Sequence, residues 1–181
     1  GVIIQEMIDP EVSGVAFGID PSTGKKDSKI ICAVFGVGEG LVSGQLNADT
    51  YTLSGDAIQE QIAIKTHAAR RGDSGQIRLT EVPEAEQLKS SLTSKKIREI
   101  QQILDLLEKK LGAPQDIEFA IRENVLYLLQ TRPVTAVIEA KKTPKNRIIW
   151  DNSNIIESYP GITTPLTFSY IQKKKKNVYL Q

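Results

Sequence analysis

Apolar residues that recur at helical spacing predict one long amphipathic helix over residues 94–111. The apolar residues on one face of this segment lie three or four positions apart: Ile97, Ile100, Leu104, Leu107 and Leu111. Thr93 or Ser94 supplies a hydroxyl that can cap the first turn. Gly112 stands where helices commonly end in a left-handed residue. We therefore expect this helix to pack its apolar stripe on a sheet.

Runs rich in β-branched and aromatic residues predict strands ahead of that helix. These strands cover residues 2–8, 13–19, 29–35 and 49–53. The segment 29–35 is apolar nearly throughout, which favours burial on both of its faces. A cluster of Asp, Pro, Ser, Thr and Gly at 20–24 predicts the turn between the second and third of these strands.

Other stretches ahead of the helix are less clearly patterned. Glycines break the strand pattern at 36–40, and 41–43 fits a short return strand. Residues 59–71 fit either a strand or a helix, and 70–74 fit a turn. Residues 81–92 are expected to form a short helix.

Two segments after the helix predict a β-hairpin. Residues 116–122 alternate polar and apolar side chains, as a half-buried strand does. A short turn at 123–124 leads into 125–131, the return strand. The elements together predict an α+β fold, a mostly antiparallel sheet with the helix 94–111 packed on it.

The polar face of this hairpin depends on how its two strands pair. Gln130 and Arg132 lie two positions apart and therefore share a face. If the numbers of paired residues add to 248, Glu118 stands directly opposite Gln130 and the loop has three residues, 123–125. We predict this register because it collects a carboxylate, an amide oxygen and a guanidinium on one surface.

The same register makes two further pairs. It matches Phe119 with Leu129 and Ile121 with Tyr127. A loop of two residues would change the sum to 247 and would place Leu129 opposite Glu118. The backbone pairing of the hairpin therefore decides between the two registers.

A surface of this kind suits a magnesium–phosphate site. Magnesium prefers hard oxygen ligands, such as the carboxylate of Glu118, the amide oxygen of Gln130 and phosphate oxygens. The planar guanidinium of Arg132 can neutralise phosphate charge during transfer. On chemistry alone, the same residues also fit a solvated hairpin face with a Glu–Arg pair.

Short motifs along the chain carry a family resemblance. They are VIIQEMI at 2–8, SGVAFGIDP at 13–21, GVGEGLVSG at 36–44, DTY at 49–51, and PQDIEFA at 114–120 with LYLLQTRPVT at 126–135. Their order and spacing resemble the nucleotide-binding domain of the phosphoenolpyruvate synthase and pyruvate phosphate dikinase superfamily. The resemblance implies that residues 1–138 are the C-terminal half of an ATP-grasp domain, in which ATP lies between two subdomains.

The resemblance also implies roles for individual residues. Glu118 and Gln130 would hold Mg²⁺, and Arg132 would be the catalytic residue that touches the transferring phosphates of ATP. The strand 2–8 would be the hinge at the adenine. The role of the glycines at 36–40 stays open, because a Gly-rich turn can cradle phosphate but is more often only a turn.

Three hinge residues are candidates for nucleotide contacts. Backbone groups of Gln5, Glu6 and Met7 would meet the edge of the base. The Glu6 carboxylate would bind the ribose, and the Met7 side chain would pack on the ring. Met7 fits a plain core residue equally well.

Composition bounds the class of protein and its setting. The chain has 181 residues, of which 40% are hydrophobic and 25% charged, and its net charge is +1. These values are ordinary for a soluble globular protein and give no reason to expect nucleic acid as a partner. The single cysteine, Cys32, excludes an internal disulfide and fits a reducing cytoplasm. No apolar run reaches the ~18–20 residues of a membrane-spanning helix, so no membrane partner is expected.

The end of the chain predicts a second region. Residues 139–147 have the composition of a linker, and 148–181 would begin a following segment, either helical or partly disordered. Within it, 150–169 resembles the segment after the ATP domain in synthase-like and antibiotic phosphotransferase-like members of the superfamily. The chain begins at Gly1 rather than Met, so we expect a piece of a longer enzyme.

The resemblance implies a phosphotransferase with paired acceptors, of the pyruvate, water dikinase type. ATP would pass a pyrophosphoryl unit to a histidine, water would release phosphate, and the remaining phosphoryl group would go to pyruvate. The first half of the ATP-grasp domain, the phosphohistidine domain and the acceptor domain would lie elsewhere in the parent. The isolated chain is therefore expected to be inactive.

Two alternatives stay open. The chain could belong to an antibiotic phosphotransferase of the rifampicin kind, which shares the ATP machinery but uses another acceptor. It could also be a non-catalytic binding module that keeps an ATP-grasp-like half-fold. The presence of Glu118, Gln130 and Arg132 together argues against the second alternative.

Overall fold

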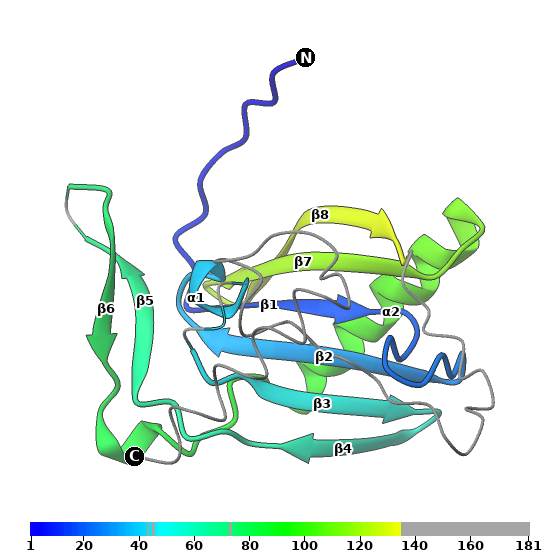
Figure 1. The fold of residues 1–181 in the computed structure, drawn as a ribbon, viewed down its shortest axis with the longest axis horizontal. Helices are drawn as coiled ribbons and strands as arrows, with labels where there is room; N and C mark the ends of the chain where they lie inside the picture. Colours follow the sequence, from blue (N-terminus) through cyan, green and yellow to red (C-terminus); the bar gives the residue numbers. More distant parts are fainter. Residues whose placement is uncertain (43, 45, 73, 135–181) are drawn as a thin grey trace, which may run out of the picture. The chain divides into compact units, whose positions relative to one another are not determined.

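The computed structural model describes residues 1–42, 44, 46–72 and 74–134, which lie within one compact unit over Gly1–Lys141 (Figure 1). The predicted linker at 139–147 and the segment 148–181 lie outside the described residues.

A six-stranded antiparallel sheet forms the centre of this unit, in the order β4-β3-β2-β1-β7-β8 (Figure 1). Its strands are β1 (Val12–Phe17), β2 (Ser28–Phe35), β3 (Asp49–Ser54), β4 (Ala57–Gln61), β7 (Gln115–Arg122) and β8 (Val125–Pro133). The chain starts this sheet in the middle, because β1 pairs with β2 on one side and with β7 on the other. The predicted α+β class is confirmed.

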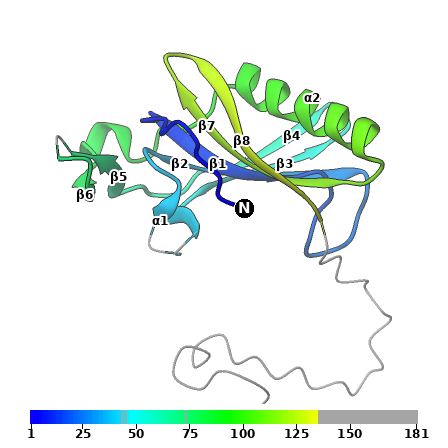
Figure 2. The ribbon, with the colours of Figure 1, turned by 90° about the horizontal axis from the view of Figure 1, so that it is seen from above.

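Smaller elements complete the described fold. A separate two-stranded sheet contains β5 (His67–Arg71) and β6 (Ile77–Glu81). A one-turn helix, α1 (Glu39–Val42), lies on the opposite side of the large sheet from the long helix α2 (Ser94–Leu111) (Figure 2). A 3₁₀ turn covers Glu84–Glu86.

Helix α2 has the predicted bounds because its end signals are local. The Thr93 side chain, rather than that of Ser94, accepts a hydrogen bond from the backbone N–H of Lys96 at 3.3 Å. Gly112 adopts a left-handed φ of 77° and donates its N–H to the Glu108 carbonyl at 2.8 Å. The predicted apolar stripe is only partly covered, because Leu111 at its end is 56% exposed.

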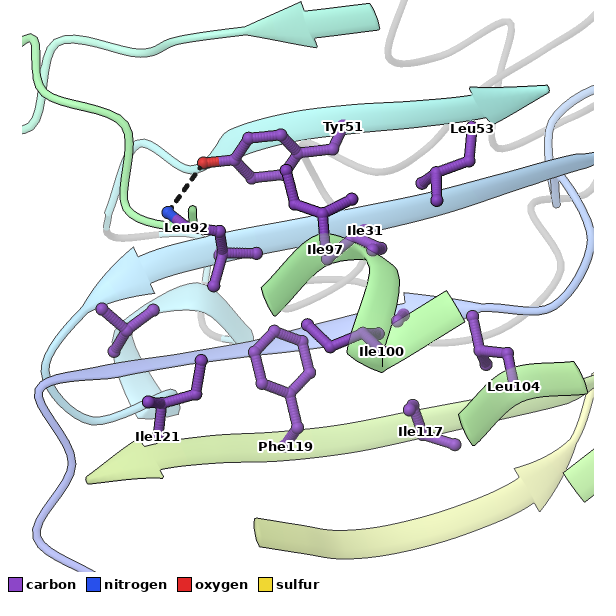
Figure 3. Close-up of a cluster of buried hydrophobic side chains, with 13 residues drawn as sticks. Ile31, Tyr51, Leu53, Leu92, Ile97, Ile100, Leu104, Ile117, Phe119 and Ile121 are labelled. Atoms are coloured by element: carbon purple, nitrogen blue, oxygen red, sulfur yellow. Dashed lines mark hydrogen bonds between the residues drawn. The ribbon is translucent and has the colours of Figure 1, made fainter. Parts of the chain in front are cut away.

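The hydrophobic core lies between α2 and the sheet. Ile97, Ile100 and Leu104 of the helix are fully buried. Figure 3 shows them among side chains from β2, β3 and β7, which include Ile31, Leu53, Ile117, Phe119 and Ile121. These residues alternate along each strand, so the other face of the sheet remains available for a site.

The strand predicted at 2–8 is not formed. Residues 1–10 have neither helical nor strand structure, and Val2, Ile3 and Ile4 are at least 90% exposed. The nearest strand in sequence, β1, already pairs on both edges. The segment reaches the free edge of β8 through the Gln5 side chain rather than through a backbone ladder. Strong β-propensity therefore does not produce a strand in this segment.

Three other local predictions need correction. The return strand predicted at 41–43 is wrong for 41 and 42, which belong to α1, and 43 lies outside the described residues. The ambiguous stretch 59–71 contains the end of β4, a connection and all of β5, so 70–71 are strand rather than turn. The helix predicted at 81–92 is reduced to the 3₁₀ turn.

Buried side-chain contacts explain why residues near 91 are not helical. The backbone N–H of Ser91 donates to Asp49 at 2.8 Å, and that of Leu92 donates to the Tyr51 hydroxyl at 3.1 Å (Figure 3). These amides are thereby committed to side chains of β3 instead of to a helical ladder.

The Asp49 carboxylate is a central structural contact of β3. It is fully buried and accepts hydrogen bonds from the Lys65 ammonium at 2.7 Å and the Ala63 N–H at 2.8 Å, besides that from Ser91. Lys65 is itself only 2% exposed and lies 5.3 Å from the centre of the Phe35 ring. One carboxylate thus ties together three segments that are distant in sequence.

We predict that Asp49→Ala strongly destabilises the fold. The change leaves the Lys65 ammonium buried without its counter-charge, which costs about 3–5 kcal/mol of unfolding free energy. Urea unfolding measures this loss. The matched control is Asp105→Ala, which removes the partner of Lys29 from a 2.9 Å pair whose carboxylate is 56% exposed. That control should cost less than about 1 kcal/mol, and equal losses in the two variants would contradict the prediction.

The predicted turn at 20–24 is confirmed, and Asp20 organises it. Asp20 accepts hydrogen bonds from the hydroxyls of Ser22 and Thr23, each at 2.6 Å, and from the Ser22 N–H at 2.9 Å. These donors favour the ionised carboxylate, and the Ser22 hydroxyl contributes most. They lower the pKa of Asp20 from 3.8 to about 2.

The turn should therefore lose this contribution only in strong acid. The stabilisation is complete above pH 3.8 and disappears as the pH falls through about 2, because the folded-state pKa is the lower one. The chemical shift of the Asp20 carboxyl carbon reports the titration directly. Ser22→Ala should move the pKa of Asp20 upward, and an unchanged titration in that variant would disprove the assignment.

Candidate functional site

A cavity of about 610 Å³ is lined in part by residues of α1 and of the central sheet. Its lining comes from parts of the chain that are far apart in sequence: Gln5, Glu6, Met7, Ile8, Pro10, Ser13, Gly14, Val15, Val37, Gly38, Glu39, Leu41, Glu118, Phe119, Ala120, Leu129 and Gln130. The volume is within the range of about 300–1,000 Å³ that small-molecule sites occupy.

The predicted pairing of Glu118 with Gln130 is confirmed. Val15 of β1 stands on the other side of Glu118, so Val15, Glu118 and Gln130 form one rung across three strands. All three line the cavity. The carboxylate and the amide that were predicted to act together therefore lie side by side at the cavity wall.

The loop that produces this pairing differs from the predicted one. The turn has two residues, Glu123 and Asn124, with φ values of 50° and 62°. Two consecutive positive φ values match the strand twist of a tight hairpin, and Asn adopts this conformation readily. The predicted three-residue loop is wrong.

A β-bulge restores the predicted register farther along the hairpin. Next to the turn, Phe119 pairs with Leu128 and Ile121 with Leu126, so the predicted partners Leu129 and Tyr127 are wrong there. The register shifts between Glu118 and Phe119, and Leu129 is the additional residue on β8.

Arg132 lies beyond the cavity lining. It stands opposite Asp116, and its Nε donates to Asp116 Oδ2 at 2.7 Å. The Arg132 side chain is 64% exposed, whereas that of Asp116 is 9% exposed. The pKa of Arg132 is raised, first by the hydrogen bond to Asp116, then by the Asp116 charge, with a smaller contribution from the Glu118 charge.

Asp116 neighbours the candidate site, and the sequence analysis did not select it. The alternation of side chains along 116–122 places Asp116 on the same face as Glu118, and this was the sequence signal that could have selected it. The contact with Arg132 additionally required the register beyond the bulge.

The three predicted hinge residues also line the cavity. Gln5, Glu6 and Met7 approach it without forming a strand, and the Met7 side chain is 51% exposed rather than part of the core. The Gln5 side-chain amide donates to the backbone carbonyl of Leu129 at 3.3 Å. The N-terminal segment is thereby connected to the bulge beside Gln130.

The Gly-rich segment borders the same cavity through Val37, Gly38 and Glu39. Gly36 has a φ of 77°, and a Cβ there would lie 2.0 Å from the Ala69 carbonyl oxygen, so only glycine fits. The Ser13 hydroxyl donates to the Gly36 carbonyl at 2.5 Å. These contacts fix the segment against β1 and β5.

The residues present fit a magnesium ion that arrives with a nucleotide. Among the residues described, no group of three or more His, Cys, Asp or Glu side chains could hold a metal ion. Glu118 and Gln130 supply two oxygen donors, and Mg²⁺ at phosphoryl-transfer sites usually takes its other ligands from substrate phosphates and water. The geometry therefore suits a shared site rather than a protein-only one.

Comparison with known proteins defines the class. Residues 1–152 match the family described as the pyruvate phosphate dikinase, AMP/ATP-binding domain. The chain belongs to this family, and the predicted phosphoenolpyruvate synthase and pyruvate phosphate dikinase superfamily is confirmed. It is therefore an AMP/ATP-binding domain of this family.

Three relatives illustrate the range of the family. The chain is 32% identical to the prodigiosin synthesizing transferase PigC of Serratia marcescens, over 98% of the chain and 22% of that protein. It is 32% identical to a probable phosphoenolpyruvate synthase of Methanocaldococcus jannaschii, over 90% of the chain and 14% of the relative. It is 36% identical to a rifampicin phosphotransferase of Bacillus cereus, over 75% of the chain and 16% of the relative.

The chain thus spans less than a quarter of the length of these relatives. In the described part of the chain, α2 and the other helices are too short or too polar to cross a bilayer.

Proposed function

We propose that this chain is the C-terminal half of an ATP-grasp domain and holds Mg-ATP for phosphoryl transfer in a phosphoenolpyruvate synthase. The observation that carries the proposal is the shared cavity. It brings the candidate hinge residues Gln5, Glu6 and Met7 to the same space as Glu118 and Gln130. Family membership supports ATP as the ligand.

The polar end of the cavity would take the phosphates. Oxygens of Glu118 and Gln130, adjacent in one rung, would bind Mg²⁺ together with phosphate oxygens of ATP. The bound ion supplies charge neutralisation at the transferring group. Glu118 and Gln130 lie on neighbouring antiparallel strands, so their backbones are held rigidly at the spacing of a sheet.

The guanidinium of Arg132 would contact the phosphates from the rim. Arg132 follows Gln130 on the same face of β8. The negative charge of Glu118 makes a small contribution to the raised pKa of Arg132. Its Nε is bound to Asp116, and a guanidinium carries further N–H donors on its two terminal nitrogens. These donors would stabilise the negative charge that spreads over the phosphate oxygens during transfer.

The base would lie at the other end, beside the N-terminal segment. Backbone groups of residues 5–7 are not committed to a strand ladder, so they can pair with the edge of adenine. Glu6 would bind the ribose, and Met7 would pack on the ring. Val37 and Leu41 line the same cavity and add apolar surface.

The remaining steps would use parts of a longer protein. A pyrophosphoryl unit would move from ATP to a histidine nitrogen, with AMP as the leaving group. Water would then hydrolyse its outer phosphoryl group to phosphate, and pyruvate would receive the remaining phosphoryl group to give phosphoenolpyruvate. Such a relay divides one difficult transfer into easier steps. The phosphohistidine domain, the acceptor domain and the first half of the ATP-grasp domain would lie outside this chain.

An antibiotic phosphotransferase is the second candidate. It would use the same Mg-ATP site and differ in the acceptor. The observation that favours it is the 36% identity to a rifampicin phosphotransferase. The acceptor is therefore the property that separates the two candidates.

We predict that the full-length protein converts Mg-ATP and pyruvate into phosphoenolpyruvate, AMP and phosphate. Phosphorus NMR detects all three products together. Glu118→Ala and Arg132→Ala should each slow the reaction by about 100-fold or more, because each removes charge stabilisation at the transferring phosphates. The control Asp105→Asn changes an exposed carboxylate on α2 and should retain wild-type activity.

Two other results would change the assignment. ATP consumption only with a rifampicin-like acceptor would establish the second candidate. No consumption of ATP with any acceptor, by a folded protein, would refute a catalytic role.

We predict that residues 1–181 alone bind Mg-ATP weakly. The chain would provide one side of an ATP-grasp site, so the dissociation constant for Mg-ATP should be larger than about 10 μM. Isothermal titration calorimetry with Mg-ATP measures it, with Glu118→Ala as the comparison. Tighter binding by the wild-type chain would show that the second half of the site is not required.

A further inference from the structure

A buried carboxylate holds the exposed guanidinium of Arg132 beside the Glu118–Gln130 rung. Asp116 is 7% exposed, stands directly opposite Arg132 and accepts the Arg132 Nε–H at 2.7 Å. Asp116 does not line the cavity, and neither does Arg132. The pair therefore lies next to the Glu118–Gln130 rung without forming part of it.

This contact restricts the conformation of a side chain that would otherwise be mobile. Arg132 extends from β8, which is an edge strand, and 64% of its side chain is exposed. A free arginine has several rotatable bonds, and fixing them costs conformational entropy. A carboxylate that is itself buried can fix the plane of the guanidinium before any ligand arrives.

The choice of nitrogen matters for the remaining donors. Asp116 binds Nε, the nitrogen nearest the backbone. Among the described residues, Asp116 is the one partner that forms a hydrogen bond with the Arg132 side chain. The two terminal nitrogens are thus the part of the fork that can meet a ligand.

We propose that Asp116 is a positioning residue, which acts through Arg132 by clamping its Nε so that the terminal nitrogens face the phosphates of ATP. The inference rests on the proposed function of the Glu118–Gln130 site. It assigns Asp116 to the arginine and not to the metal ion, because its carboxylate is already engaged by Arg132 outside the cavity lining.

A double-mutant cycle in the full-length protein tests this assignment. The assay is a single turnover of Mg-ATP to AMP, which needs no acceptor. We expect Arg132→Ala to slow it by about 100-fold or more, and Asp116→Ala by about 10- to 100-fold through misplacement of the guanidinium. The double variant should be no slower than Arg132→Ala, because Asp116 then has nothing to position.

Conservative variants separate positioning from folding. Asp116→Asn keeps an oxygen that can accept the Nε–H and should be faster than Asp116→Ala. The Mg²⁺ concentration that gives half the maximal rate should stay within about twofold of wild type, since Asp116 is not a ligand. Asp105→Asn, whose carboxylate pairs with Lys29 instead, is the matched control and should behave as wild type.

A spectroscopic readout makes the test independent of activity. Arginine-selective ¹⁵N labelling of the full-length protein should show a protected Arg132 Nε–H signal, assigned by its absence in Arg132→Lys. That signal should be lost in Asp116→Ala and retained in Asp105→Asn. It reports the clamp whether or not the protein turns over.

The possible results have distinct meanings. Additive losses in the double variant, or a tenfold increase in the Mg²⁺ requirement of Asp116→Asn, would overturn the inference and make Asp116 act independently of Arg132. An unprotected Arg132 signal in the wild type would overturn it as well. A folded wild type that shows the protected signal but forms no AMP would refute the proposed function, and the assignment to phosphate transfer with it.

Discussion

One additional residue in β8 decides which side chains face the cavity. Side chains alternate along a strand, so an extra residue moves every later side chain to the opposite face. Before the bulge, Leu126 and Leu128 pair with the core residues Ile121 and Phe119, and after it Gln130 pairs with Glu118. A ladder that continued from the turn in its initial register would turn Gln130 and Arg132 toward α2. The bulge thus lets one strand serve the core at one end and the site at the other.

The sequence predicted the pairing of Glu118 with Gln130 but not the β-bulge that produces it. A three-residue loop and a two-residue loop followed by a bulge give the same pairing of Glu118 with Gln130. The alternation of polar residues reports only the final faces. The turn contains no glycine, so its sequence does not indicate two positive φ values. Asn124 belongs to a residue type that adopts positive φ readily, whereas Glu123 does not. Chemical reasoning about the shared surface therefore predicted the pairing of Glu118 with Gln130 correctly but attributed it to the wrong loop length.

Predictions succeeded where the determinants are local and failed where they are tertiary. The bounds of α2 follow from the Thr93 cap, the apolar stripe and Gly112, all within the segment itself. The segment 2–8 has strong strand propensity, but it contacts the edge strand β8 through the Gln5 side chain and not through a ladder. The amides near residue 91 are taken by buried side chains of β3. Asp116 escaped selection because its importance lies in a cross-strand partner.

The charge balance at the site bears on which form of the nucleotide it accepts. Three carboxylates of the described residues line the cavity, those of Glu6, Glu39 and Glu118. Asp116 and Arg132 beside it carry opposite charges, so the whole group sums to −3. On the proposed function, free ATP would meet net repulsion there, and Mg²⁺ alone would have only the side chains of Glu118 and Gln130 as protein ligands. The magnesium complex of ATP resolves both difficulties, because the ion offsets the carboxylate charge while the phosphates complete its ligand shell. The protein would thereby bind the Mg-ATP complex in preference to free ATP or free Mg²⁺, because its own side chains supply only part of the ligand shell of the ion.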